Sequence, residues 1–128
     1  MLPGCDILVL CCPLTPETEG IIGRTELALL PEHAIVVNIG RGQLVDEEAM
    51  TEALRARRLG AAVLDVARVE PLPQDSPLWD LDNVLICPHS ASTFATENAT
   101  LVELFLENLR RFRSGAPMRN LYHADRGY

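Results

Sequence analysis

Residues 34–58 read AIVVNIGRGQLVDEEAMTEALRARR, and this stretch decides the fold. It begins with a short apolar run rich in valine and isoleucine, which is typical of a strand in a buried parallel sheet. A loop with the sequence Gly40-Arg41-Gly42 follows. Asp46 then stands where a helix N-cap is expected, with acidic residues in the next turn and arginines at the far end. A strand, a glycine-bearing loop and a helix in this order indicate an α/β fold.

The rest of the chain repeats this alternation. Further strands are expected at residues 6–12, 61–66 and 84–87, and the run 6–12, DILVLCC, is continuous and predicts a strand buried on both faces. Helices are expected at residues 25–30, from 46 to about 58, and 94–113, the last closed by Gly115. A proline-bearing loop joins the third and fourth strands, at about residues 67–82. The alternation predicts a parallel sheet with right-handed crossovers.

Composition excludes several classes of protein. The chain has 128 residues, enough for one hydrophobic core, and a formal net charge of -7, which disfavours nucleic acid as a partner. No apolar run approaches the roughly 20 residues of a membrane span, and no signal peptide is recognisable at the start. The four cysteines show no C-x-x-C spacing, so we expect no metal site and expect free thiols in the cytoplasm.

Three polar residues each follow a predicted strand. Arg41 comes after AIVVN, Glu70 after AAVLDV, and His89 after VLIC-Pro. In an open α/β sheet the carboxyl ends of the strands line one crevice, where ligands bind. An arginine can grip a carboxylate with two hydrogen bonds, a histidine can move a proton near neutral pH, and a glutamate can orient that histidine. We therefore expect these three side chains to converge, with Glu70 in hydrogen-bond reach of His89.

Four motifs resemble those of the D-isomer-specific 2-hydroxyacid dehydrogenases, a family that includes glyoxylate/hydroxypyruvate reductases and phosphoglycerate dehydrogenases. The motifs are CPLTPETEGIIG, VVNIGRGQLVDEEAMTEAL, LDVARVEPLPQDSPLW and NVLICPHSAS. The resemblance implies part of a Rossmann-type doubly wound parallel sheet, namely the second half of an NAD(P)-binding domain at residues 1–93. It also implies that residues 94–128 form a helix and tail that pack on a substrate domain missing from this chain.

The resemblance implies an activity and roles for the strand-end residues. The activity is reversible hydride transfer between NAD or NADP and a small 2-keto or D-2-hydroxy acid. Arg41 is expected to bind the substrate carboxylate, and His89 to act as the general acid/base. Glu70 is expected to hydrogen-bond the His89 ring and to favour its protonated form. For the full-length form we expect a homodimer.

Other residues are expected by resemblance to contact the cofactor. Asp65 is expected to face the nicotinamide, and the remaining contacts are expected from Cys12, Pro13, Thr18, Ile39, Gly40, Arg41, His89, Ser90, Ala91 and Ser92. Trp79 is expected to pack in the core, the alternative being a wall of the substrate pocket.

One feature of the family is absent. A G-x-G is present at Gly40 and Gly42, but Val45 stands where the third glycine of G-x-G-x-x-G belongs. The diphosphate cradle and the residue that selects NAD or NADP are therefore not found, and we expect a truncated form. Two alternatives stay open: an inactive fragment, and a non-catalytic NAD(H)-binding protein similar to the C-terminal-binding corepressors.

Overall fold

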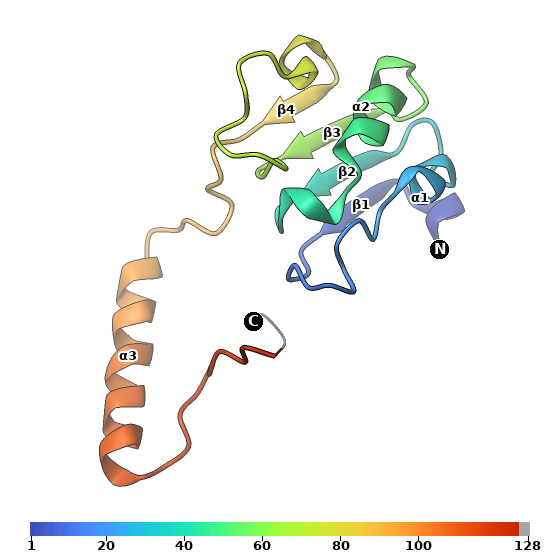
Figure 1. Ribbon diagram of the computed structural model, residues 1–128. Helices are drawn as coiled ribbons and strands as arrows, with labels where there is room; N and C mark the ends of the chain where they lie inside the picture. The colour runs from blue at the N-terminus through green and yellow to red at the C-terminus, as the bar shows by residue number, and fades with distance from the viewer. Residues whose placement is uncertain (126–128) are drawn as a thin grey trace. The chain divides into compact units, whose positions relative to one another are not determined.

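The computed structural model describes residues 1–125 and contains one sheet of four strands in the order β1-β2-β3-β4 (Figure 1). The strands are β1 (Ile7–Leu10), β2 (Ile35–Asn38), β3 (Ala61–Leu64) and β4 (Val84–Ile86). All neighbouring strands pair in parallel. Each strand lies inside one of the predicted runs, and the predicted α/β class with a parallel sheet is confirmed.

The connections between the strands lie on one face of the sheet. Helix α1 (Arg24–Ala28) joins β1 to β2, helix α2 (Glu47–Arg55) joins β2 to β3, and the short helix η3 (Pro77–Asp80) precedes β4. The strand order advances one step at a time in one direction, so right-handed crossovers place every connection on the same side. Helices α1 and α2 accordingly lie beside each other over that side (Figure 1).

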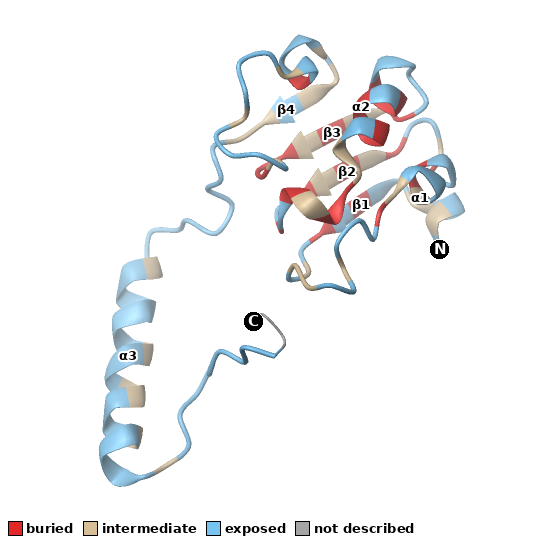
Figure 2. Ribbon diagram, viewed as in Figure 1, coloured by how far each residue is buried: buried red, intermediate tan, exposed pale blue. Residues whose placement is uncertain are grey.

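The core fills the space between the sheet and these helices (Figure 2). Alternate strand residues point into it, so that Leu8, Val36 and Leu64 are buried while their neighbours along each strand are not. Helix α2 contributes Leu54, which is completely buried. The helix begins as predicted, because the Asp46 carboxylate accepts a hydrogen bond of 3.0 Å from the amide of Ala49.

The opposite face of the sheet is apolar and is covered by no helix of residues 1–91. Ile7, Val9 and Leu85 are 58%, 50% and 59% exposed. Register pairs Val9 with Val37, Val37 with Val63, and Val63 with Leu85, so these side chains form one continuous row. We call Ile7, Val9, Val37, Val63 and Leu85 the open face. The expectation that the strand at residues 6–12 is buried on both sides is therefore wrong, because β1 lies at an edge of the sheet and all crossovers cover the other side.

The chain forms two compact units, of which the second begins at Ser92. This unit contains α3 (Glu97–Ser114), which ends at Gly115 in the left-handed region, at a φ of 72°. The helix starts three residues later than expected, because residues 94–97 form a turn closed by the Glu97 amide and the Phe94 carbonyl. No residue of α3 is buried. The predicted division at residues 93 and 94, and the packing of the second part on a substrate domain, stay predictions.

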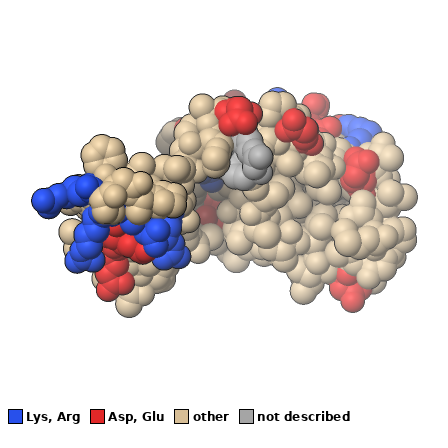
Figure 3. Space-filling view, turned by 90° about the horizontal axis from the view of Figure 1, so that it is seen from below, with Lys and Arg blue, Asp and Glu red and all other residues tan. Residues whose placement is uncertain are grey.

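Arginines gather on this second unit (Figure 3). Near the end of α3, Glu107 pairs with Arg111 at 2.8 Å and with Arg119 at 3.0 Å. These are exposed ion pairs of the kind that contribute little to stability. No helix among residues 1–125 is both long and apolar enough to cross a bilayer.

Candidate active site

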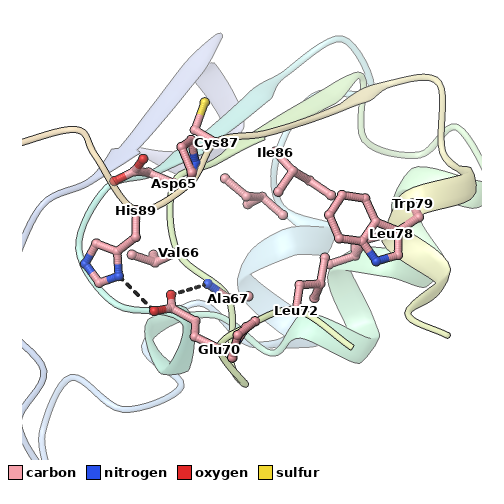
Figure 4. Close-up of a pocket in the computed structure, with 13 residues that line it drawn as sticks. Asp65, Val66, Ala67, Glu70, Leu72, Leu78, Trp79, Ile86, Cys87 and His89 are labelled. Carbon is pink, nitrogen blue, oxygen red and sulfur yellow. Dashed lines mark hydrogen bonds and ion pairs between the residues drawn. The ribbon is translucent and has the colours of Figure 1, made fainter. Parts of the chain in front are cut away.

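His89 and Glu70 are in direct contact at the carboxyl end of the sheet (Figure 4). The Nδ1 atom of His89 lies 2.8 Å from Oε2 of Glu70, and Oε1 of Glu70 accepts a hydrogen bond of 2.9 Å from the amide of Ala67. Glu70 is in the loop after β3, and His89 follows β4. The predicted proximity of these two side chains is confirmed.

The surroundings of Glu70 favour its ionised form. The Ala67 amide and the His89 ring hold the pKa of the Glu70 carboxyl below its ordinary value, and the charge of Arg41 acts in the same direction. An ionised carboxylate only accepts hydrogen bonds, so Nδ1 of His89 is the donor. The other ring nitrogen, Nε2, has no hydrogen-bond partner among residues 1–125. The pair is therefore set up to exchange a proton through Nε2.

Asp65 fixes the backbone next to His89. The Asp65 side chain is buried, and its two oxygens accept hydrogen bonds of 2.8 Å from the amides of Ser90 and Ala91. Burial alone would raise the pKa of the Asp65 carboxyl, but the two amides outweigh it and the net pKa is lowered. His89 itself has a φ of 53°, a left-handed conformation that costs a non-glycine residue about 1–3 kcal/mol. Asp65 offsets this strain by binding the two following amides.

Arg41 lies in the loop after β2, and Asn38 shapes that loop. Asn38 is 1% exposed, and its side chain accepts from the Gly40 amide at 3.1 Å and donates to the Arg41 carbonyl at 2.9 Å. The Arg41 side chain is exposed and donates to the Gly40 carbonyl at 2.7 Å. It forms no ion pair with Glu70, although its charge affects that carboxyl.

Gly42 brings the Arg41 loop and the Glu70 loop together. A Cβ atom at Gly42 would overlap the backbone of Ala67 and Arg68, so only glycine allows these two segments to touch. The Arg68 backbone is also held by Glu47, which accepts from its amide at 2.8 Å, and by Gln43, which donates to its carbonyl at 3.3 Å. The Arg41 and Glu70 loops are therefore fixed side by side.

The residues predicted to bind the cofactor fall in adjoining loops. Thr18 closes the loop after β1 by donating to the Pro13 carbonyl at 2.8 Å. Gly40 lies against the Cys12 carbonyl, where a Cβ atom would approach to 3.0 Å, and the neighbouring Ile39 is 43% exposed. Asp65, Ser90 and Ala91 form the cluster described above. Ser92 belongs to the second unit, and its contact with a cofactor stays a prediction.

The two glycines of the G-x-G do not form a phosphate cradle. Gly40 packs against Leu44 and Cys12, and Gly42 against Ala67, so both serve close contacts within the protein. Among residues 1–125 no group of three or more His, Cys, Asp or Glu side chains could hold a metal ion. The cysteines at positions 5, 11, 12 and 87, all within that part of the chain, are free.

Trp79 does not pack in the core, so that expectation is wrong. The side chain is 53% exposed, and the indole Nε1 donates to the Pro73 carbonyl at 2.8 Å. The core position of this segment belongs to its neighbour Leu78, which is 1% exposed. A one-residue offset on the short helix η3 (Pro77–Asp80) separates the two environments.

Sequence reasoning missed the residues that hold the loops in place, chiefly Asn38, Gly42 and Glu47. The one usable signal was Asn38, a polar residue that ends an apolar strand just before a glycine, where an amide side chain can bond to its own loop. The contacts of Gly42 and Glu47 with residues 67 and 68 join distant parts of the sequence, and no local pattern marks them.

Comparison with known proteins places residues 1–91 in the family model described as "D-isomer specific 2-hydroxyacid dehydrogenase, NAD binding domain". Among curated proteins, the chain is 44% identical over 120 residues to glyoxylate/hydroxypyruvate reductase B of Pectobacterium atrosepticum. That match covers 94% of this chain and 38% of the relative. The chain thus spans less than half the length of this relative.

Two of the solved structures that are similar over 99% of this chain are as follows. One is a D-isomer specific 2-hydroxyacid dehydrogenase from Xanthobacter autotrophicus Py2 in complex with NADPH and MES, with a TM-score of 0.91, 46% identity and 52% of that chain covered. The other is an NADPH-dependent glyoxylate/hydroxypyruvate reductase from Sinorhizobium meliloti in complex with NADP and sulfate, with a TM-score of 0.89, 34% identity and 41% covered. The resemblance seen in the four motifs is confirmed.

Proposed function

The chain belongs to the D-isomer specific 2-hydroxyacid dehydrogenase family, and we propose that it supplies the proton-transfer and substrate-orienting residues for interconversion of a small 2-keto acid and a D-2-hydroxy acid. The observation that carries the proposal is the 2.8 Å contact between Nδ1 of His89 and Oε2 of Glu70. In this contact Nδ1 is bonded to the Glu70 carboxylate, so Nε2 is left to bind the substrate. The names of the relatives support a small acid as the substrate.

His89 moves the proton of the reaction. As a hydride adds to the carbonyl carbon, negative charge develops on the carbonyl oxygen, and Nε2 of His89 gives that oxygen a proton. In the reverse direction Nε2 takes the hydroxyl proton. Glu70 holds the ring in orientation through Nδ1 and stabilises the imidazolium form by its negative charge, as a buried carboxylate does for the histidine of a catalytic triad.

Arg41 orients the substrate. Its guanidinium can form two parallel hydrogen bonds to the substrate carboxylate, which fixes both the position and the plane of that group. Asn38 and Gly42 fix the loop that carries Arg41, so less conformational freedom is lost when substrate binds. A lysine in place of Arg41 would keep the positive charge but could not form the two parallel hydrogen bonds.

A nicotinamide cofactor, NAD or NADP, supplies the hydride when it is bound. We propose that the nicotinamide end of the cofactor contacts Asp65, His89 and the backbone that follows them. The loop at residues 12–18 would contact the cofactor farther from the nicotinamide. Residues 1–125 are not proposed to bind the diphosphate of the cofactor, because Gly40 and Gly42 are packed against protein atoms.

We further propose that the full-length enzyme is a cytoplasmic homodimer in which residues 94–128 pack on a substrate domain. Free cysteines throughout the described part of the chain suit a reducing compartment.

A chimeric enzyme tests the proposal. This chain replaces the matching 120-residue segment of the Pectobacterium reductase, to which it is 44% identical. We expect the chimera to oxidise NADH or NADPH when glyoxylate or hydroxypyruvate is added, measured by cofactor absorbance. A folded chimera that binds cofactor but turns over neither acid, beside an active parent, would contradict the proposal.

A further inference from the structure

The turn at residues 67–70 carries Glu70 and determines where its carboxylate lies. Oε1 of Glu70 accepts a hydrogen bond of 2.9 Å from the Ala67 amide, and Oε2 lies 2.8 Å from Nδ1 of His89 (Figure 4). The carboxylate therefore joins the backbone of its own turn to the histidine ring. A shift of the Ala67 backbone would move the carboxylate and change the orientation of that ring.

The side chains of this turn do not fix its position. Val69 is 58% exposed, and Arg68 and Glu70 are exposed as well. Segments that bury few apolar groups open at a low cost in free energy. The position of the turn therefore depends on contacts that reach it from another part of the chain.

Glu47 supplies the strongest of these contacts. Its Oε2 accepts a hydrogen bond of 2.8 Å from the Arg68 amide, whereas the hydrogen bond from Gln43 to the Arg68 carbonyl is 3.3 Å long. A hydrogen bond to a carboxylate is about twice as strong as one between neutral groups. Gly42 adds a close backbone contact with the turn but no hydrogen bond to it.

Glu47 stands on a rigid element. It is the first residue of α2 (Glu47–Arg55), and Asp46 caps this helix by accepting a hydrogen bond of 3.0 Å from the Ala49 amide. Met50 and Leu54 are buried and attach the helix to the core. A side chain on a packed helix holds its partner more precisely than one on a loop.

We infer that Glu47 is a positioning residue for the proton transfer, because it holds the 67–70 turn where Glu70 can orient the ring of His89. The inference rests on the proposed function, in which His89 gives the proton to the substrate. Glu47 acts through the Arg68 amide and the turn, so its loss should disturb the histidine ring without removing any group that takes part in the chemistry.

Loss of Glu47 should affect turnover rather than substrate binding. The loop that carries Arg41 is held separately by Asn38, whose side chain bonds to the Gly40 amide and the Arg41 carbonyl. In the chimeric enzyme, Glu47→Ala should lower kcat by about 10- to 100-fold, as for a misplaced reacting group, and leave KM for the keto acid nearly unchanged. The solvent deuterium isotope effect on kcat should rise, because proton transfer becomes slower relative to the other steps.

Matched variants separate positioning from a general effect on the helix. Glu48 is also an acid in the first turn of α2, but it is exposed and forms no hydrogen bond with the 67–70 turn. Glu48→Ala removes the same charge from the helix N-terminus and should leave kcat unchanged. Circular dichroism establishes that each variant of the chimera is folded.

Two conservative changes at the same position sharpen the test. Glu47→Gln keeps a side-chain oxygen that can accept from the Arg68 amide and should retain most of the parent turnover. Glu47→Asp keeps the charge at the helix N-terminus but lacks a methylene group, so its oxygens fall short of the Arg68 amide. Its kcat should therefore drop as in Glu47→Ala.

The orientation of the ring is measured without turnover. In a chimera labelled with ¹⁵N-histidine, the ring signals of His89 are those that disappear in His89→Ala. In the parent chimera Nδ1 should carry the proton that Glu70 accepts, and in Glu47→Ala the neutral ring should shift toward a mixture of its two tautomers. Glu48→Ala should keep the parent spectrum.

Two results would overturn the inference. One is a folded Glu47→Ala chimera with the parent kcat or the parent ring spectrum. The other is an equal effect of Glu47→Ala and Glu48→Ala, which would assign the loss to the helix terminus alone. A parent chimera that turns over no keto acid would instead end the proposed function, and the ring spectrum would still decide whether Glu47 positions Glu70 and His89.

Discussion

The carboxyl ends of the strands and the open face of the same sheet differ in their contacts. The polar side chains at the strand ends are hydrogen-bonded, whereas the apolar side chains of the open face have no helix of residues 1–91 packed on them. At the strand ends, Asn38, Asp65 and Glu70 hold the loops after β2, β3 and β4 with hydrogen bonds of 2.8–3.1 Å. On the open face, side chains such as Val9 and Leu85 are half or more exposed, and no helix of residues 1–91 packs on them.

The strand ends carry the residues that position the candidate catalytic groups, whereas the open face carries apolar side chains that another surface can cover. The strand-end residues of the candidate site are held by polar contacts within residues 1–91. Apolar faces of this kind gain stability only when another surface covers them, and when exposed they drive association. Changes at the strand ends should therefore alter catalysis, and changes on the open face should alter association.

The largest effect is expected at His89. In the chimeric enzyme, His89→Ala should lower turnover by roughly 10²–10⁴-fold, the usual scale for loss of a general acid/base. The control is Leu85→Gln on the open face, for which we expect the unchanged turnover of the parent chimera. Steady-state turnover is measured by cofactor absorbance. A similar loss of turnover in both variants would contradict the distinction between the strand ends and the open face.

A stability effect is expected at Gly42. In Gly42→Ala the new methyl group meets the backbone of Ala67 and Arg68, so the Arg41 and Glu70 loops must separate. We expect the free energy of unfolding of the chimeric enzyme to fall by about 1–3 kcal/mol, as in other overpacked sites. Gly4→Ala is the matched control, because no atom lies within 4 Å of its added Cβ. Urea denaturation that gives equal values for both variants would show that the two loops are not in close contact.

Acid should weaken the strand-end contacts. The pKa values of the Asp65 and Glu70 carboxyls are lowered in the folded chain, so each group contributes stability above its unfolded pKa, about 3.9 and 4.3. This contribution should be lost as the pH falls from about 4 through the lower folded values. Urea denaturation at a series of pH values should give a shallower acid dependence for Asp65→Asn than for Asp75→Asn, a change on the exposed loop. Identical curves would refute the role of Asp65.

The smallest effect on the chemistry is expected from the open face. We expect the 128-residue chain alone to be oligomeric, aggregation-prone or partly molten, and to bind NADH weakly or not at all. Changing Val9 to threonine and Leu85 to glutamine together should lower the mass seen by light scattering, and the same two changes should leave chimera turnover unaltered. A wild-type chain that is a monodisperse monomer and binds NADH at micromolar affinity would contradict this expectation.

The sequence predicted the features that depend on local rules. The cap at Asp46, the helix end at Gly115 and the parallel strands follow from spacing and residue type. The contact of Glu70 with His89 could be predicted because both residues follow strands that end at the same edge of the sheet. Whether Arg41, Glu70 and His89 carry the proposed roles stays a prediction.

The features that were missed depend on tertiary structure. The continuous apolar run at residues 6–12 predicts burial on both faces, but exposure of Val9 follows from which side the crossovers cover. Trp79 and Leu78 are adjacent and both apolar, and only the packing of η3 (Pro77–Asp80) decides which of them is buried. The contact of Gly42 with Ala67 joins two loops across the sheet, which no short motif records.

Chemical rescue of His89→Ala tests the central claim most directly. The variant chimera is assayed for reduction of a 2-keto acid with increasing concentrations of imidazole, a free molecule that carries the same proton donor. If His89 supplies the proton, the rate should rise in proportion to the concentration of imidazolium and should follow its titration with pH. A variant that keeps the parent rate, or one that is folded and inactive at every imidazole concentration, would contradict the assignment of His89 as the proton donor.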